Sequence, residues 1–493
     1  MKHYRKLFIL IVMAFFTVFF TVLHPVPIMD GDDMIYILQS RAAIPYPGAW
    51  NPAKVLPEVL MPLCGNLSGM MAALGLGSFM SCQVFVLALM FSAFIGFYTY
   101  CFMRVLEKRM GADRFTAIAL SVLFLLFHFL ALRTGKTDNQ YLFFTFDANC
   151  VFNYVIPVLL NCGMTMLLIG VENSRALISE GSVFKRALFV TGVYFAVFSN
   201  LFASVVLAAY VGFYLLHKLI ICLRAKSGVK EYARENIVYI VILAMWLVAL
   251  CLEGTGDRAS IAYNTSGSVF ARLGASLAVF SAKLAETSLL IRLIALFAVA
   301  GAVPVLFFRC NKEERKDFLT MVIIAVAYAL ATGIFLILFG TITTTDYLSR
   351  IDVVFGFFAV MLFIVMLCIC LIVRKFALLE LLLPVAIIFT YTMTNTDGHT
   401  FKDINELAIN GHLALEIQED ICQQILTGAE SGAEEITVYV VKTNDGWSNW
   451  PHNLSLGDEY AKIFYKYGLI DRPVKVTVVP SYEFNEKYGL KMG

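Results

Sequence analysis

Three carboxylates lie within four residues near the start of the chain, in the segment Asp30-Gly-Asp-Asp33, and Tyr36 follows them. Carboxylates at this spacing repel one another, which favours the uptake of a proton. Such a group can serve as a general base, or its oxygens can hold Mg²⁺ or Mn²⁺. An acidic turn that caps a helix is the alternative, since Asp is favoured at helix starts. The residue types leave open which of Asp30, Asp32 and Asp33 would be the base.

Three basic residues in later segments could bind a phosphate. Lys54 offers a compact charge, whereas the guanidinium groups of Arg258 and Arg350 can bind a phosphate through two parallel hydrogen bonds. Glycines just before Arg258 let the backbone approach a ligand closely. The alternatives are a simple glycine-containing turn at Arg258 and an ion pair of Arg350 with Asp346 or Asp352.

Further polar side chains could hydrogen-bond the hydroxyl groups of a sugar or of an acceptor. They are Glu58, Asn149, Asn153, Tyr154, Asp257, Asp346 and Tyr347. For the amides the alternative is a helix cap, and for the tyrosines it is a place in the aromatic belt of a membrane interface. Trp50 could stack on a sugar ring, but for this residue alone the aromatic belt is the favoured interpretation.

The composition places these residues in a membrane protein. The chain has 493 residues, of which 59% are hydrophobic and 15% charged, and its mean hydropathy is +0.77. Soluble domains are about 45–50% apolar and about 25% charged, and they cannot bury this much apolar surface. The net charge of +2 argues against nucleic-acid binding. We therefore predict an all-α polytopic membrane protein.

Eleven apolar segments are candidates to cross a bilayer, which takes about 20 residues. The predicted spans are 7–24, 78–103, 115–133, 151–171, 187–199, 202–222, 236–252, 287–308, 318–340, 351–373 and 376–393. Only Ser199-Asn200 interrupts the apolar run 187–222, so this run forms either two short spans or one broken helix. Residues 55–75 contain Pro57, Pro62 and several glycines, which favours an interfacial or half-inserted segment.

Lysine and arginine residues gather in alternate loops between these spans, beginning with the N-terminal segment. Because basic loops stay in the cytoplasm, we predict that the N-terminus is cytoplasmic and the C-terminus external. Residues 1–393 would form a transmembrane module with a first external loop at 25–77, and 394–493 a small external α/β domain. Helices are expected in this domain at 403–426 and 456–467, and strands at 436–441 and 474–479.

With this topology all the candidate groups lie on the outer side of the membrane, near the ends of spans. Together they predict an outward-facing polar cavity with carboxylates on one loop and cations on others. Such a cavity suits a lipid phosphate that carries a hydrophilic group. The lipid tail would stay in the bilayer, the phosphate would meet a cation, and a carboxylate would deprotonate an acceptor hydroxyl.

At these residues the chain resembles the GT-C superfamily of integral membrane glycosyltransferases. Members carry an acidic pair and then an aromatic residue after the first helix, here Asp32-Asp33 and Tyr36. The stretch 36–75 resembles the juxtamembrane helices of the family. Asn153-Tyr154 and Gly256-Asp-Arg258 are similar to motifs of bacterial members of the O-antigen glucosyltransferase or cell-wall-polysaccharide type.

The resemblance implies transfer of a sugar from a polyprenyl-phosphate donor to a glycan or lipid-linked acceptor, on the outer face of a bacterial plasma membrane. Asp32 would act as the base with Asp33 in support, and Arg258 and Arg350, with Lys54 as a third candidate, would neutralise the leaving phosphate. No metal is required by this scheme, although Mg²⁺ or Mn²⁺ stays open. The alternatives are a flippase or other transporter for polyprenyl-linked glycans, and a polysaccharide polymerase.

Overall fold

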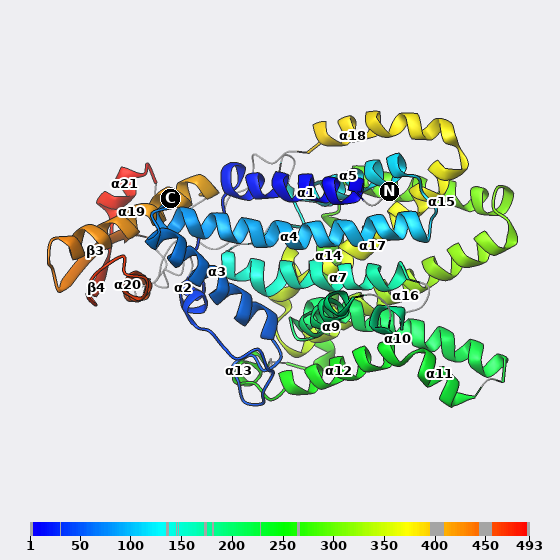
Figure 1. Ribbon diagram of the computed structural model, residues 1–493, viewed down its shortest axis with the longest axis horizontal. Helices are drawn as coiled ribbons and strands as arrows, with labels where there is room; N and C mark the ends of the chain where they lie inside the picture. Colours follow the sequence, from blue (N-terminus) through cyan, green and yellow to red (C-terminus); the bar gives the residue numbers. More distant parts are fainter. Residues whose placement is uncertain are drawn as a thin grey trace.

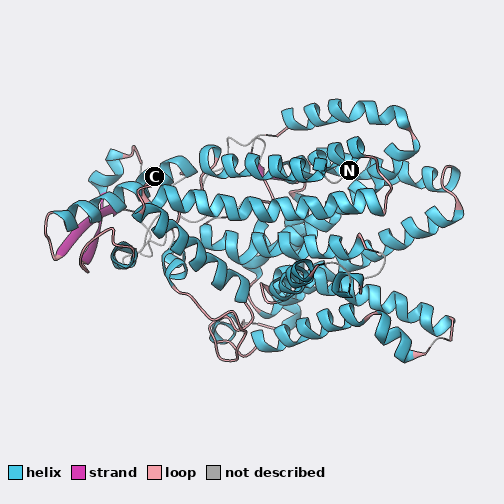
Figure 2. Ribbon diagram, viewed as in Figure 1, coloured by secondary structure: helices cyan, strands magenta, loops and turns pink. Residues whose placement is uncertain are grey.

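The computed structural model describes residues 3–29, 31–134, 138–143, 145, 147–171, 175–179, 182–226, 228–263, 267–394, 409–442 and 456–490. These parts of the chain are mostly helical, with only four short strands among them (Figure 2). Eight of the described helices are long and apolar enough to cross a membrane, and a ninth span results if one bent pair is counted as a unit. The protein is therefore a multi-pass helical membrane protein.

Most of the predicted spans correspond to long helices. The eight span-length helices are α1 with its π-helical last turn (His3–Leu23), α3 (Val55–Ala73), α4 (Phe79–Lys108), α6–α7 (Ala148–Ile169), α10 (Leu201–Arg224), α15 (Leu289–Phe308), α16 (Lys312–Ile342) and α17 (Ile351–Lys375). The bent pair is α11 (Val229–Glu235) with α12 (Ile237–Glu253), which meet at 79°. By length and composition, the described residues thus contain eight or nine candidate spans, fewer than the eleven that the sequence predicted.

Three predicted spans are helices shorter than a typical crossing. The segment 115–133 is α5 (Arg114–Leu130), which ends where the short strand β1 (Leu132–Thr134) turns back to pair with β2 (Asp138–Gln140). The segment 187–199 is α9 (Val183–Val197), and 376–393 is a 3-10 turn, Ala377–Leu382, followed by α18 (Leu383–Thr392). Asn200 accepts a hydrogen bond from Phe202 N and caps α10, so the chain is interrupted at the predicted Ser199-Asn200 and continues as a second helix.

The segment 55–75, predicted to be interfacial or half-inserted, is largely the continuous helix α3, which is long and apolar enough to cross a membrane. Pro57 lies in the first turn of the helix, where a missing N–H costs nothing, and Pro62 is accommodated in its interior. Glycines allow close packing on this helix. A Cβ at Gly65 would lie 2.5 Å from Ile37 Cγ1, and one at Gly69 would lie 2.2 Å from the ring of Tyr467.

A helix that the sequence did not predict, α14 (Val269–Ala285), packs along α16 and leads into α15. The break between α14 and α15 exchanges backbone hydrogen bonds with the end of α5. Ser288 N donates to Ala131 O over 3.0 Å, and Arg133 N donates to Glu286 O over 2.9 Å. Two interrupted helices thereby satisfy each other's backbone groups, as irregular backbone inside a membrane protein requires.

Helix α4 runs through the bundle between α1 and α7 (Figure 1). Small residues bring these helices close. A Cβ at Gly96 would lie 2.8 Å from Met13 Cγ, and one at Gly163 would lie 2.6 Å from the ring of Phe97. Because apolar side chains gain nothing from leaving lipid, this close packing is the main attraction that holds the helices together.

The C-terminal part contains α19 (Gly411–Glu430), β3 (Glu435–Val441), α20 (Leu456–Lys466), β4 (Lys475–Ser481) and α21 (Tyr482–Lys487). The strands pair in parallel, with Val438 opposite Val478. Both strands and the second helix lie where the sequence predicted them. The first helix begins at 411 rather than 403, and 403–408 lie outside the described residues. That 394–493 is a separate domain stays a prediction.

This C-terminal part lies at one end of the bundle, and the N-terminus lies toward the other end (Figure 1). It packs on α2 (Gly31–Leu38), α3 and α4. Phe464 meets Phe79 edge to face, and Ser81 Oγ donates to Glu419 over 2.8 Å. The C-terminal part therefore supports the segment that carries the acidic pair.

Candidate functional site

Two adjoining cavities lie near α2 and α13 (Asp257–Ala262), toward the end of the bundle that carries the C-terminal part (Figure 1). The larger has a volume of about 540 Å³ and the smaller about 180 Å³. Their common wall consists of Trp50, Arg258, Tyr263, Thr343 and Tyr347. Asp32 and Tyr36 line only the larger cavity, whereas Lys54, Tyr154 and Glu253 line only the smaller one.

The two aspartates of the acidic pair both lie on α2, but their side chains have different surroundings. Asp32 is exposed and faces the larger cavity. Asp33 is fully buried: Oδ1 accepts from Asn149 N over 2.6 Å, and Oδ2 accepts from Met29 N over 2.9 Å. Neighbouring helical residues point about 100° apart, which explains why one aspartate reaches the cavity and the other does not. Asp30, the third candidate base, lies outside the described residues.

Arg258 is held at the junction of the two cavities by both its backbone and its side chain. Its N–H donates to Trp50 O over 3.4 Å, and Nη2 donates to the hydroxyl of Tyr347 over 3.1 Å. Tyr347 belongs to the 3-10 turn Thr345–Ser349, which precedes α17. Most of the donors of the guanidinium remain available to a ligand, because a neutral hydroxyl uses only one of them.

Lys54 is buried at the start of α3, with Nζ 5.7 Å from the ring centre of Tyr154. Burial and the neighbouring Arg258 charge lower the pKa of Lys54 to about 7, against the opposing effect of Glu253 and Glu58. The ammonium group is therefore partly neutral near pH 7. A phosphate in the cavity would favour its charged form.

Arg350 forms the ion pair that the sequence offered as an alternative to phosphate binding. Its Nε and Nη2 donate to Asp352 Oδ1 and Oδ2 over 3.1 and 2.6 Å. The guanidinium also lies 4.6 Å from the ring centre of Tyr154. Tyr154 lines the smaller cavity and Arg350 does not, so Arg350 can orient the tyrosine ring without forming part of the cavity wall.

The residues predicted to bind sugar hydroxyls divide into two groups. Tyr154 and Tyr347 line the cavities. Glu58 instead pairs with Arg41 over 2.5 Å and accepts from Asn51 Nδ2 over 3.0 Å, so it stabilises the loop before α3.

The remaining four residues of this set do not line either cavity. They are Asn149, Asn153, Asp257 and Asp346. Asn153 Nδ2 donates to Asn149 Oδ1 over 2.6 Å, and the two amides are buried together. Asp257 and Asp346 are exposed at the starts of their helices, where the helix dipole stabilises a negative charge. Asn149 and Asn153 lie inside helical segments rather than at a cap, whereas Asp257 and Asp346 lie in the first turns of their helices.

Several cavity residues were not predicted as site residues. Tyr36 follows Asp32 by four positions on the same helix and therefore shares its face, a signal that the sequence did contain. Trp50 was favoured as a residue of the membrane interface, yet it lines both cavities. No pattern in the sequence marks Tyr263 or Thr343, because they reach the wall only through the packing of α13 and the end of α16.

Within the described ranges, no group of three or more His, Cys, Asp or Glu side chains lies together as a metal site would need. Both carboxylate oxygens of Asp33 accept backbone hydrogen bonds, which makes this residue a poor metal ligand.

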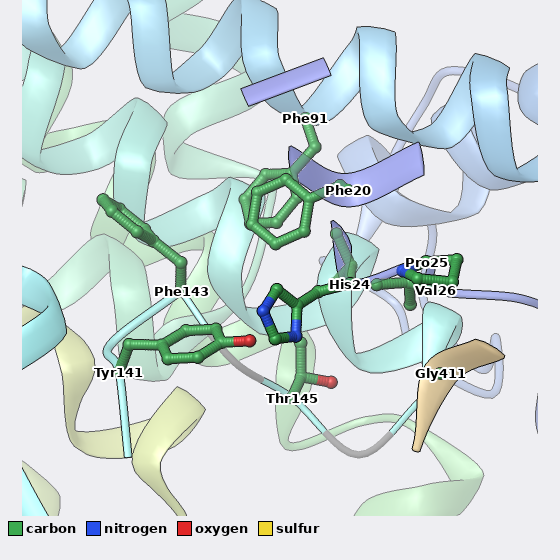
Figure 3. Close-up of a pocket in the computed structure, with 10 residues that line it drawn as sticks. Phe20, His24, Pro25, Val26, Phe91, Tyr141, Phe143, Thr145 and Gly411 are labelled. Carbon is green, nitrogen blue, oxygen red and sulfur yellow. The ribbon is translucent and has the colours of Figure 1, made fainter. Parts of the chain in front are cut away.

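A third, much smaller cavity lies beside α1 and the loop before α6 (Ala148–Cys150), with a volume of about 20 Å³ (Figure 3). Phe20, Phe91 and Phe143 form apolar walls, and the hydroxyl of Tyr141 points toward the imidazole of His24. A space of this size has room for about one water molecule. It is therefore too small for a substrate.

Gly256 sets the distance between α13 and the loop that carries Trp50. A Cβ at this position would lie 2.5 Å from Pro52 Cδ and 3.0 Å from Trp50 O. We expect Gly256→Ala to displace Arg258 and to weaken substrate binding about tenfold, with little effect on overall stability. Gly274→Ala is the matched control, since Gly274 lines neither cavity and its Cβ would meet nothing within 4 Å. Equal substrate affinity in the two variants would contradict this role of Gly256.

Comparison of the chain with known protein families, with curated proteins and with solved structures finds no match. The class of protein therefore follows from the helices alone, and any activity has to be argued from the cavities.

Proposed function

We propose that this protein is a glycosyltransferase that moves a sugar from a polyprenyl-phosphate donor to an acceptor hydroxyl. The observation that carries the proposal is the placement of Asp32 and Arg258 on the wall of one cavity of about 540 Å³. A base and a cation in one cavity are what this reaction needs, since a proton leaves the acceptor while negative charge develops on the departing phosphate.

The smaller cavity supports a lipid-linked donor. Lys54 and Arg258 supply positive charge to one part of its wall. The rest includes the apolar residues Leu201, Phe202, Leu250, Phe339 and Ile342, which come from the ends of α10, α12 and α16. Ile342, one of these residues, is 44% exposed. A phosphate held by the two cations would therefore have an apolar route for its lipid chain toward the bilayer.

In the proposed reaction, Asp32 accepts the proton of the acceptor hydroxyl as its oxygen bonds to the anomeric carbon. The bond between that carbon and the phosphate oxygen breaks, and its electron pair stays with the lipid phosphate. Arg258 and charged Lys54 neutralise this leaving group. Arg350 is assigned a positioning role through Tyr154, because Asp352 occupies two of its donors.

The proposed location is the outer face of a bacterial plasma membrane, with the N-terminus in the cytoplasm. The concentration of lysine and arginine in alternate loops supports this orientation. The opposite placement of the N-terminus and the C-terminal part along the bundle is compatible with it (Figure 1).

The test is a transfer assay with the purified full chain in lipid vesicles and radiolabelled polyprenyl-phosphate sugars. We expect Arg258→Ala to raise the donor KM by about 10–100-fold, the loss of one charge-assisted contact. Arg258→Lys should recover part of this loss. Movement of labelled lipid across the vesicle without a new glycosidic bond would replace the proposal with a flippase, and long products would replace it with a polymerase.

The charge of Lys54 predicts how donor binding depends on pH. Burial and the charge of Arg258 lower the pKa of Lys54 to about 7, and a bound phosphate would raise this pKa. Above pH 7, donor binding must therefore be coupled to proton uptake, so the donor KM should rise by about tenfold per pH unit. Below pH 7 it should be flat.

The measurement is the donor KM between pH 6 and 9 for the native protein and for Lys54→Met. The variant should bind the donor more weakly but lose the rise above pH 7. A rise that persists in Lys54→Met would assign the titration to another group.

A further inference from the structure

Trp50 is fixed in place although much of its surface is exposed. Its side chain lines the larger cavity together with that of Tyr36. Its carbonyl accepts from Arg258 N over 3.4 Å, and α13 approaches it closely at Gly256. The side chain nevertheless remains 45% exposed. The backbone of Trp50 is thus fixed against α13, while its side chain stays open at the wall of the larger cavity.

The surroundings of Trp50 combine flat aromatic rings with hydroxyl and carboxylate groups. Tyr36 and Tyr263 line the same cavity, and Tyr263 and Ile261 form an exposed edge of it, at 60% and 73% exposed. Asp32, Thr344 and Tyr347 contribute polar atoms. Tryptophan and tyrosine present an apolar ring face together with a polar atom. A sugar ring needs this combination, since it has apolar C–H faces and hydroxyl groups around its edge.

We propose that the larger cavity is the acceptor site and that it binds a glycan, with one sugar ring stacked on Trp50 and a hydroxyl directed to Asp32. This inference rests on the proposed function and names its acceptor. The apolar wall of the neighbouring cavity accounts for the lipid of the donor, so the two substrates meet at their common wall. The acceptor sugar then enters from the aqueous side, past Tyr263 and Ile261.

A binding experiment tests the site without relying on catalysis. Methyl glycosides of glucose, galactose, mannose, rhamnose and N-acetylglucosamine serve as probes for the full chain in detergent micelles. We expect at least one of them to quench tryptophan fluorescence in a saturable manner, and Trp50→Ala to abolish this quenching. If none of them quenches the fluorescence of the native protein, the proposal is overturned.

The kinetic experiment separates stacking from membrane anchoring. We expect Trp50→Ala to raise the KM for the glycoside acceptor about tenfold or more. Trp50→Phe, which keeps a ring, should recover most of the affinity. Phe270→Ala is the control for anchoring, because Phe270 is 85% exposed at the start of α14. It should not change the acceptor KM.

The remaining outcomes are also decisive. An unchanged acceptor KM in Trp50→Ala would assign Trp50 to the membrane interface. An equal loss of acceptor affinity in Trp50→Ala and Trp50→Phe, together with a lower melting temperature in both, would make its role structural. Transfer to lipid-linked acceptors alone would overturn the choice of a glycan entering from water. Glycoside binding at Trp50 without any transfer would instead refute the proposed function, and so the two failures can be told apart.

Discussion

Replacing Asp32 with Asn is expected to lower kcat for sugar transfer by about 10²–10⁴-fold, the usual contribution of a general base. The amide keeps the size of the side chain and its ability to accept a hydrogen bond, but it cannot take a proton. Because Asp32 is exposed whereas Asp33 is fully buried, we expect the substitution to disturb the packing of α2 less than Asp33→Asn does. The donor KM and the melting temperature should therefore stay close to native values.

The measurement is a single-turnover experiment with saturating donor, which isolates the chemical step. Asp471→Asn provides the control, since Asp471 is an exposed aspartate in a turn of the C-terminal part. It should transfer at the native rate. If Asp32→Asn keeps more than a tenth of the native kcat, another group is the base.

Composition and apolar runs predicted the class of the protein because they report on solvent preference. The same signals failed where tertiary packing decides the outcome. Residues 55–75 contain prolines that suggested interruption, yet the close contacts of Gly65 and Gly69 hold a continuous helix. Helix α14 was not predicted, because its apolar residues occupy only part of its surface and the sequence does not show that α16 covers them.

The candidate site was predicted in part. Residue types marked Asp32 and Arg258, and the fold brings them to one cavity. Type and spacing could not distinguish Asp32 from Asp33, since that depends on which face of α2 meets α6. They also could not show that Arg350 is occupied by Asp352. A charge pattern indicates which groups can interact, whereas the packing of the helices decides which of them remain available to a substrate.

Replacing Asp33 with Asn is expected to give the opposite result, a loss of stability with little loss of chemistry in the protein that remains folded. Asp33 accepts one backbone N–H on each carboxylate oxygen, from Asn149 and from Met29. Asn offers one oxygen and one amino group, so one of these backbone donors would face another donor. Hydrogen bonds to a charged group are each worth about 1.5–3 kcal/mol, and an unsatisfied buried donor adds to the loss. We expect about 2–4 kcal/mol of destabilisation.

The two aspartates then form a reciprocal pair of experiments on adjacent residues. Thermal unfolding in detergent should show a clear decrease in melting temperature for Asp33→Asn and almost none for Asp32→Asn. Activity per folded molecule should show the reverse. An unchanged melting temperature together with a lost kcat in Asp33→Asn would transfer the role of base to Asp33. Such a result would require α2 to rotate in the substrate complex, because the carboxylate of Asp33 is fully buried against backbone donors.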